Sequence, residues 1–227
     1  MLVTSATLLL FAGGCSDDAT NPTGEGRYRI TAYLLEDFST VSVRIVRLDS
    51  RDPEAPTAMI TVDGLPMQLD PMSSAEEAIF GASLQPMLGQ SHSVVIALAG
   101  NHASTTLVAP SQPSELAITS PPPDSLYYEP GSSLQLEWQY DGDAPGEFSL
   151  LVTVLAGIHT RIYADSLSPG SRSTEISGST TSSWIVGQQA FVTLDARRRD
   201  SIAGDLAAEG STSTVLFATA DLTLTRR

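Results

Sequence analysis

The sequence predicts an all-β protein built as two tandem sandwiches, and three observations point to this fold class. Apolar and polar residues alternate along most of the chain, as in Tyr28, Ile30, Ala32 and Leu34, which is the period of strands with one buried face. Short turn signals rich in Gly, Asp and Asn separate the alternating segments. Residues 73–77 carry the one helical signal, and it is long enough for a single turn.

The first element is a short apolar stretch that leads to the chain's one cysteine. Leu2–Ala12 is apolar, two glycines follow, and Cys15 precedes an acidic polar segment. The stretch is too short to span a bilayer and has the length of a processed signal. This pattern resembles the signal of bacterial lipoproteins, although Ala12 stands where Leu is usual and no basic residue precedes Leu2.

The resemblance implies that residues 1–14 are removed and that acyl chains are attached to Cys15, which would form a stable membrane anchor. In that family an Asp directly after the cysteine favours retention at the inner membrane. Ser16 holds that position here, so the resemblance implies the outer membrane. The residues alone leave another interpretation open, an apolar N-terminal strand with a buried Cys15.

The next element, residues 15–26, lacks large apolar side chains and is expected to be a flexible tether. The chain as a whole is acidic, with a net charge of −14 from 26 acidic and 12 basic residues. Such a surface argues against binding to nucleic acid or directly to anionic lipid headgroups.

A first sandwich is expected over residues 27–112. The alternation that begins at Tyr28 returns at 41–45, 58–62 and 80–84, and turn signals such as Asp63–Gly64 separate these segments. Ser73 and Glu76 have the spacing of a capping box, which predicts one helical turn between two strands.

Proline-rich sequence at 109–125 marks a domain boundary, because proline cannot continue a sheet. A second sandwich is expected over residues 113–227. Its predicted strands include 134–140, 148–154, 181–186, 190–196 and 214–224. Seven or eight short strands in about a hundred residues are typical of an immunoglobulin-like sandwich.

Residues 128–138, YEPGSSLQLEW, resemble the opening of bacterial immunoglobulin-like or fibronectin-III-like domains. The resemblance implies that Trp138 lies on the second strand of its domain, in the core. Residues 82–98, followed by Ala109 and Pro110, resemble another immunoglobulin-like module common in surface lipoproteins. Both resemblances concern the fold and imply no activity.

The residues offer little catalytic chemistry. His92, His102 and His159 do not have the spacing of a zinc site, and no metal or cofactor is expected. Residues 89–93, GQSHS, end in Ser93 where the nucleophile elbow of a serine hydrolase requires Gly. The acidic segment 141–143 has the composition of a turn. We therefore expect a protein that is not an enzyme.

Three aromatic residues are the candidate ligand-binding side chains: Tyr127, Tyr128 and Trp184. Adjacent residues on an extended segment point in opposite directions, so one of the two tyrosines is expected at the surface. Trp184 lies between polar and apolar neighbours, so the sequence is compatible with an exposed or a buried side chain. The basic cluster 197–199 is expected to be a solvated loop or a contact for an acidic partner.

Together these observations predict a lipid-anchored protein of the bacterial cell envelope with a non-catalytic binding or structural role. Its expected partners are the membrane, through the acyl chains, and an envelope protein or a glycan. The alternative is a carbohydrate-binding module, acting alone or beside an enzyme. That alternative predicts that Trp184 and one of Tyr127 and Tyr128 are exposed on one face.

Overall fold

The computed structural model describes residues 28–35, 37–48, 58–74, 76–85, 87–98, 100–122, 126–156, 158–184 and 189–227, without the side chains of 155–162. Residues 1–27, which include the signal segment 1–14 and Cys15, lie outside these residues, so the anchor and the tether stay predictions. In the described part no helix is long and apolar enough to cross a membrane.

The described residues form an all-β structure, as the alternation predicts. The first half contains β1 (Tyr28–Leu34), β2 (Thr40–Arg47), β3 (Met59–Val62), β4 (Leu65–Pro66), β5 (Gln68–Leu69), β6 (Glu77–Ser83), β7 (Ser91–Leu98) and β8 (Asn101–Val108). The second half contains β9 (Glu115–Ser120), β10 (Tyr127–Tyr128), β11 (Leu134–Asp141), β12 (Glu147–Ala156), β13 (Ile158–Leu167), β14 (Ser173–Ile176), helix α1 (Gly178–Thr181), the 3-10 turn η2 (Ser182–Trp184), β15 (Gln189–Ser201) and β16 (Thr212–Arg226).

Each half is a sandwich of two sheets. In the first half, the order β1-β2-β6-β5 faces the order β4-β3-β7-β8. In the second half, β13-β12-β15-β16 faces β14-β11-β9, and β10 pairs with β16. Both arrangements follow the strand order of immunoglobulin-like sandwiches, in which strands A, B, E and D oppose strands C, F and G. The all-β sandwich fold is thus confirmed.

The core explains why these strands form. Their inward-facing positions carry Val, Ile, Leu and aromatic side chains, and the buried apolar residues form a single cluster that includes members of both halves. Trp138 on β11 is buried, as the family resemblance implies, and its ring packs edge-on against Phe148 of β12 with 5.6 Å between ring centroids. Edge-to-face pairs of this kind add to the free energy gained by burial alone.

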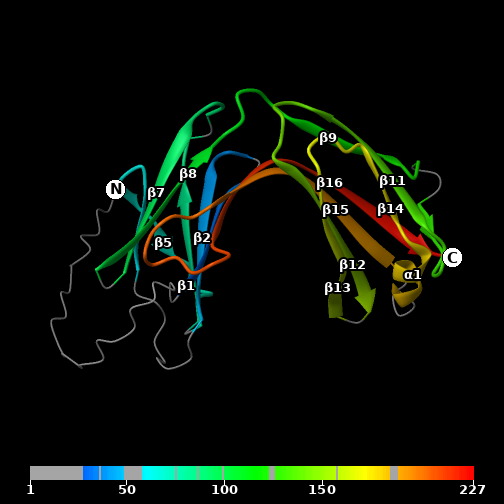
Figure 1. Cartoon of the computed structure of the whole chain (residues 1–227), viewed down its shortest axis with the longest axis horizontal. Helices are drawn as coiled ribbons and strands as arrows, with labels where there is room; N and C mark the ends of the chain where they lie inside the picture. Colours follow the sequence, from blue (N-terminus) through cyan, green and yellow to red (C-terminus); the bar gives the residue numbers. More distant parts are fainter. Residues whose placement is uncertain are drawn as a thin grey trace, which may run out of the picture.

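One large sheet crosses the division at residues 112 and 113. The first strand of the first half, β1, pairs in parallel with the beginning of β16, where Thr31 lies opposite Thr212 and Leu34 opposite Val215. Figure 1 shows the resulting arch, in which β15 and β16 reach from one arm across to the other. The division itself stays a prediction, but the two halves share nine strands of one sheet.

The loop between β15 and β16, residues 202–211, lies on the first half and is named here the strut loop. Its Ala203 exchanges two backbone hydrogen bonds with Ser104 of β8, at 2.8 and 3.2 Å. Near its end, the buried Ser211 accepts a hydrogen bond at Oγ from the backbone N–H of Ile30, at 3.0 Å. The strut loop therefore satisfies backbone groups that the first half would otherwise leave unpaired.

Gly204 makes this close approach possible. Its φ of +128° is a conformation that other residues rarely adopt, and a Cβ there would lie 2.2 Å from the carbonyl oxygen of His102.

The connector between the halves is also held. Asp143, in the turn after β11, accepts hydrogen bonds from both the backbone N–H and the hydroxyl of Ser111, the latter at 3.0 Å. The Tyr140 hydroxyl donates to the carbonyl oxygen of Asp143 at 2.6 Å. Asp141 thus ends β11 and residues 142–143 bend away from it, close to the turn that the composition predicts. Through Asp143 this bend is joined to the connector at Ser111.

Two local predictions are wrong. Ser73 caps no helical turn: its hydroxyl accepts a hydrogen bond from the N–H of Ile79 on β6, at 3.0 Å, and residues 71–72 form a turn. The strand predicted at 181–186 is replaced, over its described part, by the end of α1 and by η2. The cause is Ser177, whose side chain accepts from the N–H of Thr180 and begins the helix.

Candidate functional site

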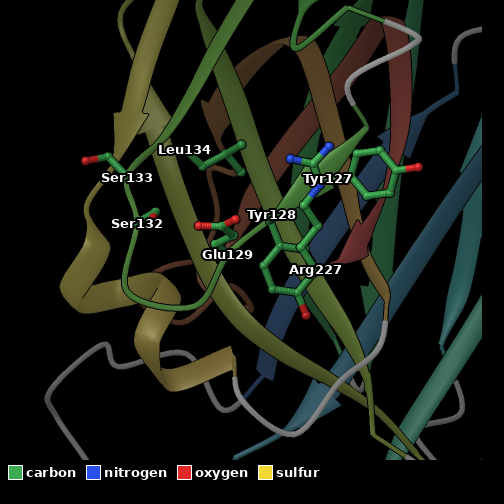
Figure 2. A pocket seen from close by; sticks show the side chains of 7 residues that line it. All are labelled: Tyr127, Tyr128, Glu129, Ser132, Ser133, Leu134 and Arg227. Carbon is green, nitrogen blue, oxygen red and sulfur yellow. The ribbon is translucent and has the colours of Figure 1, made fainter.

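The two adjacent tyrosines lie on β10, which pairs in parallel with the end of β16. Because neighbouring side chains on a strand point to opposite faces, Tyr127 is 46% exposed whereas Tyr128 is 4% exposed. Figure 2 shows the two rings pointing in different directions. Of the pair, Tyr127 is the ring that a ligand can reach.

Trp184 is a core residue. It ends η2 and is 1% exposed. Its ring packs edge-on against Tyr128 with 5.6 Å between ring centroids and an interplanar angle of 65°. The Tyr128 hydroxyl donates to the Trp184 carbonyl oxygen at 3.5 Å, and burial raises the pKa of that hydroxyl.

This burial corrects the candidate set. A sugar platform made of Trp184 and one tyrosine on a common exposed face is not formed, because Trp184 and Tyr128 fill the core beneath β10. Tyr127 remains as an exposed ring, and its neighbours define the candidate site.

A hollow of about 250 Å³ opens beside Tyr127. One wall is the segment that follows β10, where Pro130 and Gly131 make a tight turn closed by a 3.0 Å hydrogen bond from the N–H of Ser132 to the carbonyl oxygen of Glu129. Gly131 has a φ of +92°, as the third position of a type II turn requires. The turn places Glu129, Ser132 and Ser133 along the rim (Figure 2).

Helix α1 holds this turn from behind. The buried Thr181 accepts at Oγ1 from the N–H of Gly131 at 3.1 Å and donates to the carbonyl oxygen of Ser132 at 2.7 Å. Gly178 lies so close that a Cβ there would come within 2.3 Å of the Gly131 carbonyl oxygen. The backbone of the rim is therefore positioned by a buried hydroxyl and a close backbone contact, which fixes the points from which its side chains project.

The opposite wall is Arg227, which follows β16. Its backbone N–H donates to the carbonyl oxygen of Tyr128 at 3.1 Å. Its guanidinium lies over the ring of Tyr127, with the central carbon 4.5 Å from the ring centroid. This cation–π contact holds the guanidinium at the edge of the hollow.

Glu129 and Arg227 are not among the site residues predicted from the sequence. Glu129 lies within residues 128–138, which carry the domain resemblance. The Pro–Gly pair in that segment predicts a turn, but it does not predict that the turn borders a hollow. Arg227 lies near Glu129 because β10 pairs with β16. A local sequence pattern does not predict a parallel pairing between distant segments.

The basic cluster 197–199 is largely engaged within the protein. Arg197 and Arg199 approach the carboxylate of Glu147 with N–O distances of 2.7 and 3.7 Å, and Arg198 lies over the ring of Phe217 at 5.3 Å. The predicted loop is wrong, because the cluster lies within strand β15. The contact with an acidic partner stays a prediction.

The pKa of Glu147 reflects these contacts. Burial raises it, but the hydrogen bond donated by Ser166 and the ion pair with Arg197 lower it by more, so the pKa lies below its ordinary value. The carboxylate therefore stabilises the folded chain wherever it is ionised.

His92 is buried in β7, and its Nδ1 lies 2.7 Å from Oδ2 of Asp63 in the turn between β3 and β4. Burial raises the pKa of Asp63, and its hydrogen bonds with His92 and with the Ser93 N–H lower it to a net value below the ordinary one. The GQSHS segment thus enters a strand, not a nucleophile elbow. Among the described residues no group of three or more His, Cys, Asp or Glu could hold a metal ion.

Comparisons with known proteins add no family. No protein-family model matches the chain, and no curated protein matches it. Solved structures similar to it include the adhesin InvE of Yersinia pseudotuberculosis, at 13% identity and a TM-score of 0.28, aligned over 87% of this chain and 61% of that one. A 1.5-MDa bacterial ice-binding adhesin aligns at 14% identity and a TM-score of 0.25, over 88% of this chain and 63% of that one.

The chain thus spans less than two thirds of the length of these two structures. Because both TM-scores lie below 0.5, neither structure supports an argument about this chain.

Proposed function

We propose that the chain is a lipid-anchored cell-envelope protein with a non-catalytic role, in which two braced β-sandwiches hold a partner at a set distance from the membrane. The observation that carries the proposal is the pairing of β1 with β16. This pairing and the docked strut loop join the halves through main-chain hydrogen bonds, so the arch resists bending. Resistance to bending is what a spacer or a scaffold requires.

The anchor rests on the N-terminal pattern, in which an apolar stretch and two glycines precede Cys15. The thiol is the group that accepts a diacylglyceryl chain in lipoproteins, and two or three acyl chains suffice for stable anchoring. The acidic chain, with a net charge of −14, has no electrostatic attraction to anionic headgroups. Membrane attachment is therefore assigned to the acyl chains alone.

Membrane fractionation tests the anchor. The Cys15→Ser variant should leave the membrane fraction, whereas the matched control Ser16→Ala should stay in it. Persistence of Cys15→Ser in the membrane fraction would contradict lipid anchoring.

The same fractionation tests the choice of membrane. The lipoprotein resemblance implies that Ser16 directs the protein to the outer membrane, so Ser16→Asp should shift it to the inner membrane on a density gradient. An unchanged profile would contradict the proposed sorting.

The binding role is tested by cross-linking the full chain in native envelopes and recovering it by an affinity tag. Enrichment of one defined envelope protein or glycan, competed by untagged chain, is expected. Recovery of the chain alone would contradict a binding role and leave the structural one.

A second candidate function, carbohydrate binding, is favoured by one observation. The half-exposed ring of Tyr127 stands beside a hollow whose rim carries hydroxyl, carboxylate and guanidinium groups. The aromatic platform that the sequence suggested is reduced to this one ring, so a sugar site would depend mainly on hydrogen bonds.

A further inference from the structure

We infer that the hollow between Tyr127, Glu129 and Arg227 is a binding site for an uncharged saccharide ring. The inference rests on the proposed binding role and names the class of ligand that one site of this chain would take. Three features of the site support it: the polar groups that face each other across it, the contacts that hold its backbone in place and its size.

The polar groups are complementary to hydroxyls. The guanidinium of Arg227 on one wall supplies only donors, and the carboxylate of Glu129 on the other supplies acceptors. Ser132 and Ser133 add hydroxyls that do both. A ligand hydroxyl also donates and accepts at once, so neighbouring hydroxyls on one ring can satisfy both walls together.

A charged ligand is attracted by one of the two charged side chains of the site, Glu129 or Arg227, and repelled by the other. A carboxylated sugar gains at Arg227 but faces Glu129, and it must approach a chain whose net charge is −14. A cationic ligand gains at Glu129 but faces Arg227, which already covers one face of the Tyr127 ring. An uncharged polyol avoids both penalties.

The backbone of the site is held in place before a ligand arrives. On the rim side, Thr181 fixes the backbone of Gly131 and Ser132. On the other side, the Arg227 N–H is bonded to Tyr128, and the guanidinium is stacked on Tyr127. Because this backbone and the guanidinium are already ordered, a ligand loses less of its binding free energy to ordering the site.

The hollow also has the size of a small ring. Its volume of about 250 Å³ lies below the roughly 300–1,000 Å³ of sites for drug-sized ligands. Leu134, a largely buried residue that lines it, adds apolar surface for the carbon face of a sugar. Several polar groups beside a small apolar surface are typical of ligand sites that fix orientation through hydrogen bonds.

Isothermal titration calorimetry tests the inference with the full chain in a detergent that has no sugar headgroup. The probes are gluco-, manno-, galacto- and xylo-oligosaccharides, with oligogalacturonates as the acidic comparison. Saturable binding of at least one neutral series is expected. Tyr127→Ala and Glu129→Ala should each weaken it at least tenfold, and oligogalacturonates should not bind.

Tyr33→Ala is the matched control, because Tyr33 is also a partly exposed strand tyrosine, 38% exposed, but lies on β1 in the other half. Its binding should equal that of the parent chain. Circular dichroism of each variant shows that the fold is kept, since the substituted side chains are exposed.

Three outcomes overturn the inference: no neutral oligosaccharide binds, only the acidic series binds, or binding is unchanged in Tyr127→Ala and Glu129→Ala. Each of these would leave the anchor and the protein partner of the proposed function intact. Conversely, persistence of Cys15→Ser in the membrane fraction would contradict the lipid anchor but would leave the sugar titration unaffected.

Discussion

Replacement of Gly204 by Ala should detach the strut loop and destabilise the chain, because two separate costs arise at that position. The added Cβ would lie 2.2 Å from the His102 carbonyl oxygen and 2.7 Å from the Ala103 Cα, both backbone atoms of β8 that cannot move freely. Overpacking of this kind costs about 1–3 kcal/mol. The φ of +128° adds backbone strain of about 1–3 kcal/mol for a residue other than glycine.

Partial relaxation of the strut loop reduces the sum, so the free energy of unfolding should fall by about 2–4 kcal/mol. For a chain of this length that corresponds to a decrease in Tm of about 4–16 °C. Thermal unfolding followed by circular dichroism measures it. Cleavage by a glutamate-specific protease after the exposed Glu209 should also become faster, because the strut loop would spend more time away from β8.

Gly170→Ala is the matched control, since a Cβ there meets no atom within 4 Å and its φ is not positive. Its Tm should equal or slightly exceed that of the parent chain, because alanine reduces the entropy of the unfolded chain. Equal Tm values and equal cleavage rates for Gly204→Ala and Gly170→Ala would refute the proposed close contact between the strut loop and β8.

Three further predictions follow from other contacts of the described residues. Ser211→Ala leaves the buried N–H of Ile30 without its acceptor, so the free energy of unfolding should fall by about 1–3 kcal/mol; a change below about 0.5 kcal/mol, as surface substitutions give, would contradict this role. Glu147→Gln should cost about 1 kcal/mol at pH 7. Because Arg197 and a hydrogen bond lower the pKa of that carboxyl more than burial raises it, the stabilisation is present above its ordinary pKa of 4.5 and lost as the pH falls through the folded-state pKa. The difference between parent and variant in urea unfolding should therefore be larger at pH 7 than at pH 3. Trp184→Ala should lower the free energy of unfolding by about 3–5 kcal/mol, and a loss below 1 kcal/mol in urea unfolding would contradict its place in the core.

Local sequence patterns predicted the features of the fold that depend on neighbouring residues alone, namely strand faces and turns. The alternation of Leu134, Leu136 and Trp138 places all three on the buried face of β11, because the side-chain period of a strand is fixed whatever strand lies beside it. The Asp63–Gly64 pair forms the turn between β3 and β4, with φ of +51° and +79°, since these residue types tolerate that conformation.

Contacts between distant segments carried no such signal. The parallel pairing of β1 with β16 joins residues about 180 positions apart. Neither segment has a sequence pattern that identifies its pairing partner. The same holds for Trp184, whose burial depends on Tyr128, 56 residues earlier. The local pattern from Thr181 to Trp184 predicted a strand. The segment is helical instead, because Ser177 caps the beginning of α1.

The parallel arrangement of β1 and β16 also determines how the molecule bears tension. A pull on the N-terminal end of β1, against a partner held at the far end of β16, displaces two parallel strands along their common axis in opposite directions. The hydrogen bonds between residues 31–34 and 212–215 then share the load at once and must break together, whereas an antiparallel hairpin pulled at its open end separates one bond at a time. The same geometry recurs where β10 runs parallel to β16, so β16, the longest strand among the described residues, resists shear near both of its ends.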